Sequence, residues 1–310
     1  MVEFNANSFE PIPSEDKSAE FIARPKITYW SDAWRRFKQN KLALISLVIL
    51  TILVILVVVG PIITENLHGF TINSQDFTRK NLSPNSVNWM GTDNLGRDLF
   101  TRVCLGGRVS LSIGILGALI ATIIGTIYGA VSAYAGGVVD NFMMRIVEIL
   151  SSIPYTLIVI LISVFVGETN MFSLILAMTI TGWTGMARLV RGQLLSLKEQ
   201  DYVLAAETLG VSKNEIVKRH LIPNTMNVIL ISISFDVPGF IFSEAFLSFL
   251  GIGIQQPQTS WGALASMAQQ RFLFYPYQLF FPSLMIALTM LVFTLIGDGL
   301  RDALDPKMRQ

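Results

Sequence analysis

Charge, cysteine and histidine are all scarce in this chain of 310 residues. Charged residues make up 15% of it and hydrophobic residues 52%, a composition far from that of a soluble domain. The net charge of +1 gives no support to a nucleic-acid partner. Cys104 is the single cysteine, so an intrachain disulfide is excluded. We expect His68 in an outer loop and His220 in a cytoplasmic hairpin, so neither joins a plausible metal site or Ser/His catalytic set.

Long apolar runs are what the sequence has instead. A bilayer core of ~30 Å needs ~20 apolar residues in a helix, and lipid offers no partners to an unpaired backbone, so these runs must be helical. We therefore expect an all-α integral membrane protein with six transmembrane helices. The six runs are 42–63, 109–139, 149–167, 169–187, 226–250 and 272–297.

The distribution of Lys and Arg predicts the orientation. If the N-terminus is cytoplasmic, the outer side receives few basic residues, as the positive-inside bias requires. Both termini and the segment 201–224 are then cytoplasmic, and the longest outer loop covers about 64–108. No cleavable signal peptide is visible, because the first ~40 residues lack an early apolar core. The basic residues placed outside are Arg79, Lys80, Arg97, Arg102, Arg108 and Arg271.

Two segments precede the first apolar run. Residues 1–26 are polar and poor in large apolar side chains, so we expect a disordered cytoplasmic tail. In residues 27–41, Trp30, Trp34 and Phe37 recur at helical spacing between basic residues. This pattern predicts a helix lying in the inner membrane interface. An ordinary basic flank with incidental aromatic residues is the alternative.

The segment 201–224 is a compact polar stretch between two apolar runs. Residues 201–209 predict a short helix that ends at Gly210, where a left-handed residue is wanted. Ser212 is then the N-cap of a second helix, and Glu215 would complete a capping box. We expect Pro223 to end this second helix and to turn the chain into the fifth span.

Small side chains at Ala205 and Ala206 would let the backbone of a partner approach the hairpin closely. A DNA-binding helix-turn-helix has a similar outline, but a short loop tied to the membrane at both ends cannot easily enter a groove. A solvated loop with no partner is the plainer alternative.

Several motifs together resemble those of one family. Ala205-Ala206-x-x-x-Gly210, followed by Ile222-Pro223, is similar to the coupling loop of bacterial ABC importer permeases, although Leu204 stands where the family usually has Glu. The segments at 91–102, 181–192, 244–251 and 297–306 resemble the C-type permease of oligopeptide and dipeptide importers. The resemblance runs from about Trp30 to the C-terminus.

This resemblance implies a type I ABC importer permease fold over residues 42–310 and a peptide importer in the cytoplasmic membrane. It implies three kinds of partner: a second homologous permease, two cytoplasmic ATPases and an external peptide-binding protein. The chain lacks a Gly-x-x-x-x-Gly-Lys-Ser/Thr run, so we expect no catalytic residue here, and ATP and Mg on the ATPases. The loop at about 198–224 would couple the subunits through Asp201, Leu204, Ala205, Ala206, Gly210, Ser212, Glu215 and Pro223.

Charged residues near or within the apolar runs form two further candidate sites. Asp236 and Glu244 interrupt the fifth run, where an acid is costly, so either lines the pathway or has a structural role. Four residues before the second run have helical spacings, including Asp98 and Arg102 at i, i+4, and predict internal ion pairs or an outer gate or docking surface. These four are Asp93, Arg97, Asp98 and Arg102.

Other functions are weighed against this one. An ion-coupled secondary transporter would need more intramembrane acids and would leave the hairpin unexplained. A permease of the same family for nickel or glutathione shares these motifs, and the sequence does not choose among the substrates.

Overall fold

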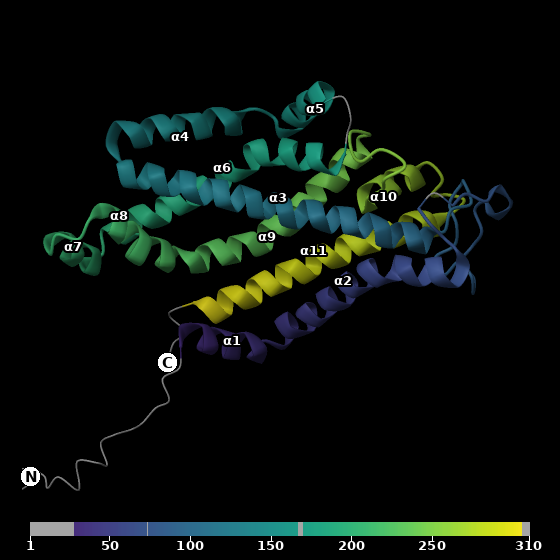
Figure 1. Ribbon diagram of the computed structural model, residues 1–310, viewed down its shortest axis with the longest axis horizontal. Coiled ribbons are helices and arrows are strands. Elements are labelled where there is room, and N and C mark those ends of the chain that lie inside the picture. The colour runs from purple at the N-terminus through teal and green to yellow at the C-terminus, as the bar shows by residue number, and fades with distance from the viewer. Residues whose placement is uncertain (1–27, 73, 167–169, 306–310) are drawn as a thin grey trace, which may run out of the picture.

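The computed structural model describes residues 28–72, 74–166 and 170–305. The predicted disordered tail, residues 1–26, lies outside this part of the chain. Within the described residues the long helices run side by side along one direction (Figure 1), and the only β-type pairing is one bridge between Thr92 and Asp98. The helices are α1 (Tyr29–Gln39), α2 (Lys41–His68), η3 (Phe77–Arg79), α3 (Leu99–Ala135), α4 (Gly137–Ser152), α5 (Tyr155–Val166), α6 (Met171–Lys198), α7 (Asp201–Thr208), α8 (Lys213–Ile216), η4 (Val217–Leu221), α9 (Ile222–Phe249), α10 (Trp261–Gln269) and α11 (Pro276–Leu304).

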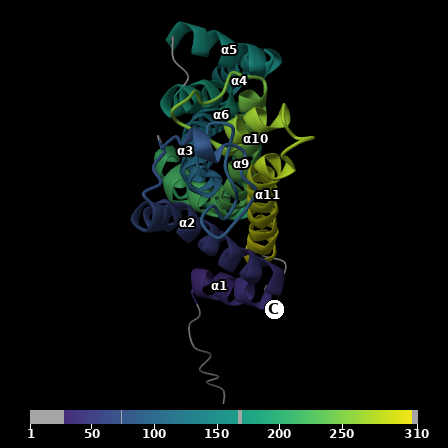
Figure 2. The same ribbon diagram turned by 90° about the vertical axis from the view of Figure 1, so that its right-hand side faces the viewer.

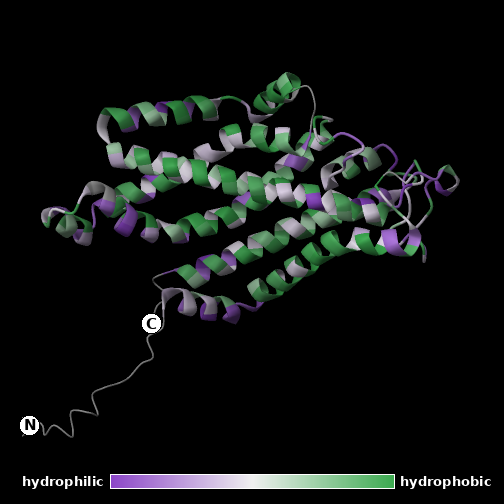
Figure 3. Cartoon of the chain, in the orientation of Figure 1, coloured by the Kyte–Doolittle hydropathy of each residue, from purple (hydrophilic) through white to green (hydrophobic). Residues whose placement is uncertain are grey.

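Five helical segments of the described chain are long and apolar enough to cross a membrane: α2, α3, α6, Val217–Phe249 and α11. A sixth span is obtained when α4 and α5 are taken as one broken span. The apolar middles and polar ends of these helices are visible in Figure 3. The expected all-α membrane fold with six spans is therefore confirmed in this form.

The third span begins at Gly137, earlier than the predicted run 149–167, and it is sharply broken. The chain breaks at Ile153 and Pro154, and α4 and α5 meet at 82°. Pro154 has no N–H to continue the helix, and it favours extended backbone in the residue before it. Ile153 has this conformation, with φ −80° and ψ 128°.

Two predicted boundaries also move. Helix α3 begins at Leu99, ten residues before the predicted run, and ends where Gly136 takes φ +64°. Helix α2 continues to His68, so the loop between them is 69–98. The sequence prediction contained no α10, whose N-cap is Ser260.

The centre of the molecule is an apolar cluster shared by five helices. Trp261 of α10 is fully buried there, and its indole N–H donates to the Val103 carbonyl at 2.8 Å. Small residues bring α3 close to its neighbours, as in many membrane helix pairs. A Cβ on Gly125 would lie 2.6 Å from the Trp183 carbonyl oxygen of α6.

Helix α1 packs across the end of α11, and Figure 2 shows the two together at one edge of the molecule. The predicted helix and its aromatic face are confirmed, because the Trp34 and Phe37 rings stack with their centroids 5.7 Å apart. Phe37 is buried, whereas Trp30 and Trp34 are 57% and 51% exposed. Phe37 also packs in a cluster with Val292 and Ile296 of α11, which accounts for its burial. Placement of α1 in a membrane interface stays a prediction.

The molecule has two polar ends. Helices α7 and α8, helix α1 and the C-terminal end of α11 lie at one end in Figure 1, and the loop 69–98 lies at the other. We call these the hairpin end and the loop end.

Candidate functional site: a capped hairpin and two sets of buried charges

The α7–α8 hairpin (residues 201–216) is built on the turn that the sequence predicts. Gly210 has φ +79°, in the left-handed region where glycine is favoured. Its N–H donates to the Glu207 carbonyl at 2.9 Å, and the Val211 N–H donates to the Ala206 carbonyl at 3.1 Å. This pair of bonds is the Schellman motif, which satisfies the last carbonyls of α7. The prediction that α7 ends at Gly210 is confirmed.

At the start of α8 the structure shows the Ser212 half of the predicted capping box. The Glu215 N–H donates to the Ser212 hydroxyl oxygen at 3.3 Å, so the predicted N-cap is present. The Glu215 carboxylate forms an ion pair with Arg219 at 3.0 Å. The Glu215 side chain therefore pairs with Arg219, one turn further along, and its prediction as the second half of the capping box is wrong.

Pro223 does not end the second helix, contrary to the sequence prediction. Helix α8 passes through the π-helical turn η4 and continues into α9, with Pro223 in the first turn of α9. The wider turn lets the Ile222 N–H donate to the Val217 carbonyl, five residues back, and the chain stays helical through the proline. Side chains assist here, because the Asn224 amide donates to the His220 carbonyl at 2.6 Å.

The hairpin has its own core, which joins it to the membrane helices. Val203, Ile216 and Leu221 are buried in one cluster with Val190 and Leu194 of α6. At the same end the Lys198 ammonium donates to the Ala133 carbonyl at 2.8 Å, which ties the end of α6 to the end of α3. The hairpin is thus packed on the bundle.

The exposed face of the hairpin is partly apolar. Leu209 is 83% exposed, and Tyr202 and Leu204 are about half exposed. Asp201 and Ala205 are exposed, but Ala206 is buried. Our prediction that both alanines face a partner is wrong for Ala206, because its methyl group fills the core between α7 and α8.

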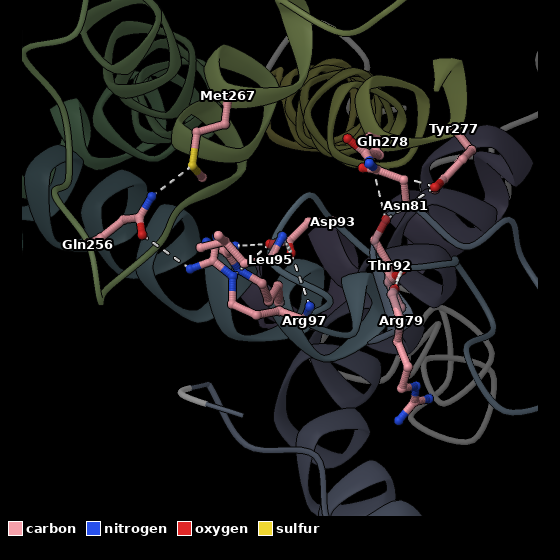
Figure 4. A network of polar contacts seen from close by, with 11 residues as sticks. Arg79, Asn81, Thr92, Asp93, Leu95, Arg97, Gln256, Met267, Tyr277 and Gln278 are labelled. Atoms are coloured by element: carbon pink, nitrogen blue, oxygen red, sulfur yellow. Dashed lines mark hydrogen bonds and ion pairs between the residues drawn. The ribbon is translucent and has the colours of Figure 1, made fainter. Parts of the chain in front are cut away.

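A second set of predicted residues forms the loop-end cluster (Asp93, Arg97, Asp98 and Arg102), shown in part in Figure 4. Arg97 Nε donates to the Asp93 carboxylate at 2.6 Å, and Arg102 Nη1 donates to the same oxygen. Burial raises the pKa of Asp93, but the Arg102 and Arg97 guanidinium groups outweigh this and lower it below its usual value. All four side chains are buried.

The predicted i, i+4 pair between Asp98 and Arg102 is not formed. Asp98 is instead the N-cap of α3, and accepts from the Thr101 N–H at 2.8 Å and from the Asn88 amide at 2.7 Å. Residues 91–98 are a loop, so helical spacing does not apply to them. Internal ion pairing is confirmed with different partners, and the role of the cluster at a gate or docking surface stays a prediction.

Polar contacts connect this loop to α11. The Gln278 amide and the Tyr277 hydroxyl both donate to the Thr92 carbonyl, at 2.8 and 3.2 Å. Arg97 also reaches the Gln256 side chain at 3.1 Å (Figure 4). The sequence did not predict these contacts, since nothing local in it indicates a pairing across so many residues.

Glu244 is fully buried and has three hydroxyl donors. Ser110 donates to Oε2 at 3.0 Å, and Ser248 and Ser260 donate to Oε1 at 2.7 and 2.5 Å. These serines come from α3, α9 and the N-cap of α10. The carboxylate therefore holds three helices together, and its contacts favour the structural role.

Asp236 has a different environment. It is half-buried beside a cavity of about 270 Å³ between α5, α6 and α9. No hydrogen bond or ion pair to it is found within the described residues. Within the same residues, no group of three or more His, Cys, Asp or Glu side chains could hold a metal.

Several long apolar helices and a packed polar hairpin at one end define the membrane-embedded subunit of a transport system. Residues 111–310 match the family model of the binding-protein-dependent transport system inner membrane component, and residues 28–84 match the N-terminal TM domain of oligopeptide transport permease C. The chain belongs to the first family, the inner-membrane permeases of ABC importers. The resemblance noted in the sequence is thereby confirmed.

Curated relatives are similar over nearly the whole length. The dipeptide transport system permease protein DppC of Bacillus subtilis (strain 168) is 46% identical over 297 residues, which cover 96% of this chain and 91% of the relative. The oligopeptide transport system permease protein OppC of the same organism is 42% identical over 304 residues, 98% of each chain.

A solved structure supports the fold alone. A chain of the MetNI methionine ABC transporter, in an inward-facing conformation, superimposes with a TM-score of 0.55 at 18% identity. The match covers 66% of this chain and 96% of the transporter chain.

Proposed function

We propose that this protein is the C-type permease subunit of an ATP-driven importer that translocates oligopeptides or dipeptides. The similarity to dipeptide and oligopeptide permeases over almost the full length supports the substrate class. An ion-coupled secondary transporter does not belong to this family. Nickel and glutathione are the alternative substrates within it.

The main support for coupling between an ATPase and the membrane helices is the unbroken helix that joins the hairpin to the fifth span. Helices α8, η4 and α9 form one continuous helical segment, and α7, which carries the exposed residues Leu204 and Leu209 at its end, packs on α8. A soluble subunit that binds α7 would act through α8 on α9, which carries Asp236 and Glu244. Coupling requires that the contacts of this subunit differ between two states of the permease.

The partners follow from what the chain lacks and from its family. The full sequence has no phosphate-binding loop, so ATP and Mg would be held by two cytoplasmic ATPases, one on each permease hairpin. A second homologous permease would complete the pathway, and an external binding protein would deliver the peptide. In this arrangement the hairpin end and both termini face the cytoplasm.

Within this proposal, Asp201, Leu204, Ala205 and Leu209 form the contact face. Ala206, Gly210, Ser212, Glu215 and Pro223 set the shape of the hairpin and its junction with α9. The loop-end cluster stabilises the opposite, external end.

The test is co-purification and uptake with Leu209→Asp. Burying a carboxylate in an apolar contact is costly, so the variant should lose most of the bound ATPase and peptide uptake while the chain still inserts. Leu273→Asp is the matched control, because Leu273 is 88% exposed at the loop end and Leu209 is 83% exposed. ATPase that stays bound to Leu209→Asp, or peptide uptake that persists without ATP on an ion gradient, contradicts the proposal.

A further inference from the structure

The cavity beside Asp236 differs from the other polar regions of the bundle. It lies between α5, α6 and α9 and has a volume of about 270 Å³, far more than a single water molecule needs. Its lining is mostly aromatic and apolar, with three oxygen-bearing side chains. The residues that bear on the proposal are Tyr155, Met178, Gly182, Asp236, Phe240 and Ser243.

Asp236 stands out among the acids buried in the bundle. Glu244 accepts from three serine hydroxyls, and Asp140 forms an ion pair with Arg191 at 2.6 Å. For Asp236 no partner is found in the part of the chain that the structure describes. An acid within a membrane span is costly unless it faces water or a partner, so an unpaired one is a candidate binding group.

One of the residues that line the same cavity, Tyr155, has a polar group without a partner. The Tyr155 hydroxyl is buried, and no hydrogen bond to it is found among the described residues. An orphaned buried hydroxyl costs free energy, which a ligand with N–H groups would recover. This observation is independent of Asp236, because Tyr155 belongs to α5 and Asp236 to α9.

The cavity is also shaped for a cation. Asp236, Phe240 and Ser243 follow each other at i, i+4 and i+7 on α9, so they share one face. Phe240 is held between helices: a Cβ on Gly117 of α3 or on Gly182 of α6 would lie 2.6 or 2.8 Å from its ring. A fixed aromatic ring beside a carboxylate is a favourable site for an ammonium group.

We propose that this cavity binds a primary ammonium group of the substrate as it crosses the membrane. The group has three N–H donors, and the cavity offers three acceptors: the Asp236 carboxylate and the Tyr155 and Ser243 hydroxyl oxygens. This inference deepens the proposed function and rests on it. The ammonium can come from the amino terminus of a peptide or from a lysine side chain.

The experiment uses the complete importer, with its second permease, ATPases and binding protein, in proteoliposomes. Uptake is measured for trialanine, for N-acetyl-trialanine and for an N-acetylated tripeptide that contains one lysine. The wild type is compared with Asp236→Asn, and Glu148→Gln is the control, because Glu148 is exposed and lies on α4 away from the cavity. The binding protein is the same in every case, so its own preference cancels when wild type and variant are compared.

The expected result is a change in selectivity. Asp236→Asn should lower the ratio of trialanine to N-acetyl-trialanine uptake about tenfold relative to wild type, and should lower uptake of the lysine peptide similarly. A loss confined to trialanine or to the lysine peptide identifies the source of the ammonium group. Tyr155→Phe, which removes only the hydroxyl, should lower the same ratio about threefold, and Glu148→Gln should leave it unchanged.

Two outcomes overturn the inference. One is an unchanged ratio in both cavity variants. The other has two parts: Asp236→Asn does not assemble with the second permease, and Tyr155→Phe leaves the uptake ratio unchanged. This result would assign Asp236 to a contact between subunits. A wild-type importer that transports none of the peptides defeats the proposed function itself, and this result is distinct from both.

Discussion

Arg191 of α6 and Asp140 of α4 form a two-pronged ion pair: Nε donates to Oδ1 and Nη2 donates to Oδ2, each at 2.6 Å. The Ser132 hydroxyl of α3 donates to the same carboxylate. The pair therefore ties the α3–α4 corner to α6, the helix that supports the hairpin.

Replacement of Arg191 by lysine should show how much this geometry matters. Lysine keeps the charge but cannot make two parallel bonds, so we expect a loss of about 1–2 kcal/mol in the free energy of unfolding. Thermal unfolding in detergent measures it. Arg145→Lys is the control, because the Arg145–Glu148 pair is exposed and such pairs contribute little. Equal stability of the Arg191 and Arg145 variants would show that the two-pronged pair is unimportant.

Gly210→Val tests the hairpin turn. No atom lies within 4 Å of a Cβ built at Gly210, so the penalty comes from its φ of +79° alone and should be about 1–2 kcal/mol. Peptide-stimulated ATPase activity and uptake should fall while membrane insertion continues. Gly192→Val is matched to it, since Gly192 has equal space and helical backbone. Full uptake with Gly210→Val would rule out a role for the turn in coupling.

Glu244→Gln separates a structural role from a pathway role. The amide nitrogen cannot accept a hydrogen bond, so part of the serine network is lost, and we expect destabilisation of about 1–3 kcal/mol. Ser248→Ala removes a single donor and should cost less. Unfolding curves and uptake are measured on the same preparations. If uptake collapses in Glu244→Gln while the unfolding temperature stays at the wild-type value, Glu244 belongs to the pathway.

The lowered pKa of Asp93 predicts that the stability of the loop end decreases in acid. Its pKa in the folded protein is lowered, so its ion pairs stabilise the fold fully above the unfolded pKa of about 3.9, and this contribution is lost as pH falls through the folded value. The unfolding temperature of wild type should therefore fall steeply below about pH 4. Asp93→Asn should be less stable at neutral pH and should show a shallower fall in acid. Asp298→Asn, an exposed acid of α11, should follow the wild-type curve. Parallel acid curves for Asp93→Asn and wild type would exclude this contribution.

Local signals account for what the sequence predicts correctly. Gly210 and Ser212 act through bonds that join residues three to five positions apart. Each of these effects depends on a short stretch of sequence, so composition and spacing are sufficient to predict it.

The wrong predictions concern choices among competing partners. Arg102 pairs with Asp93 and not with Asp98, because Asp98 is used as an N-cap. Pro223 stays inside a helix, because a π-helical turn precedes it. Of the serines around Glu244, Ser248 is at the local spacing i+4, but Ser260 and Ser110 lie 16 and 134 residues away and no local pattern joins them to it.

The continuous segment Val217–Phe249 is 33 residues long, which at about 1.5 Å per residue makes a rod of about 50 Å. A rod of this length magnifies small rotations: a tilt of about 5° about its hairpin end moves the opposite tip by about 4 Å. In the proposed importer, a small tilt imposed by a partner subunit at the hairpin end would therefore be enlarged to several ångströms at the far side of the membrane.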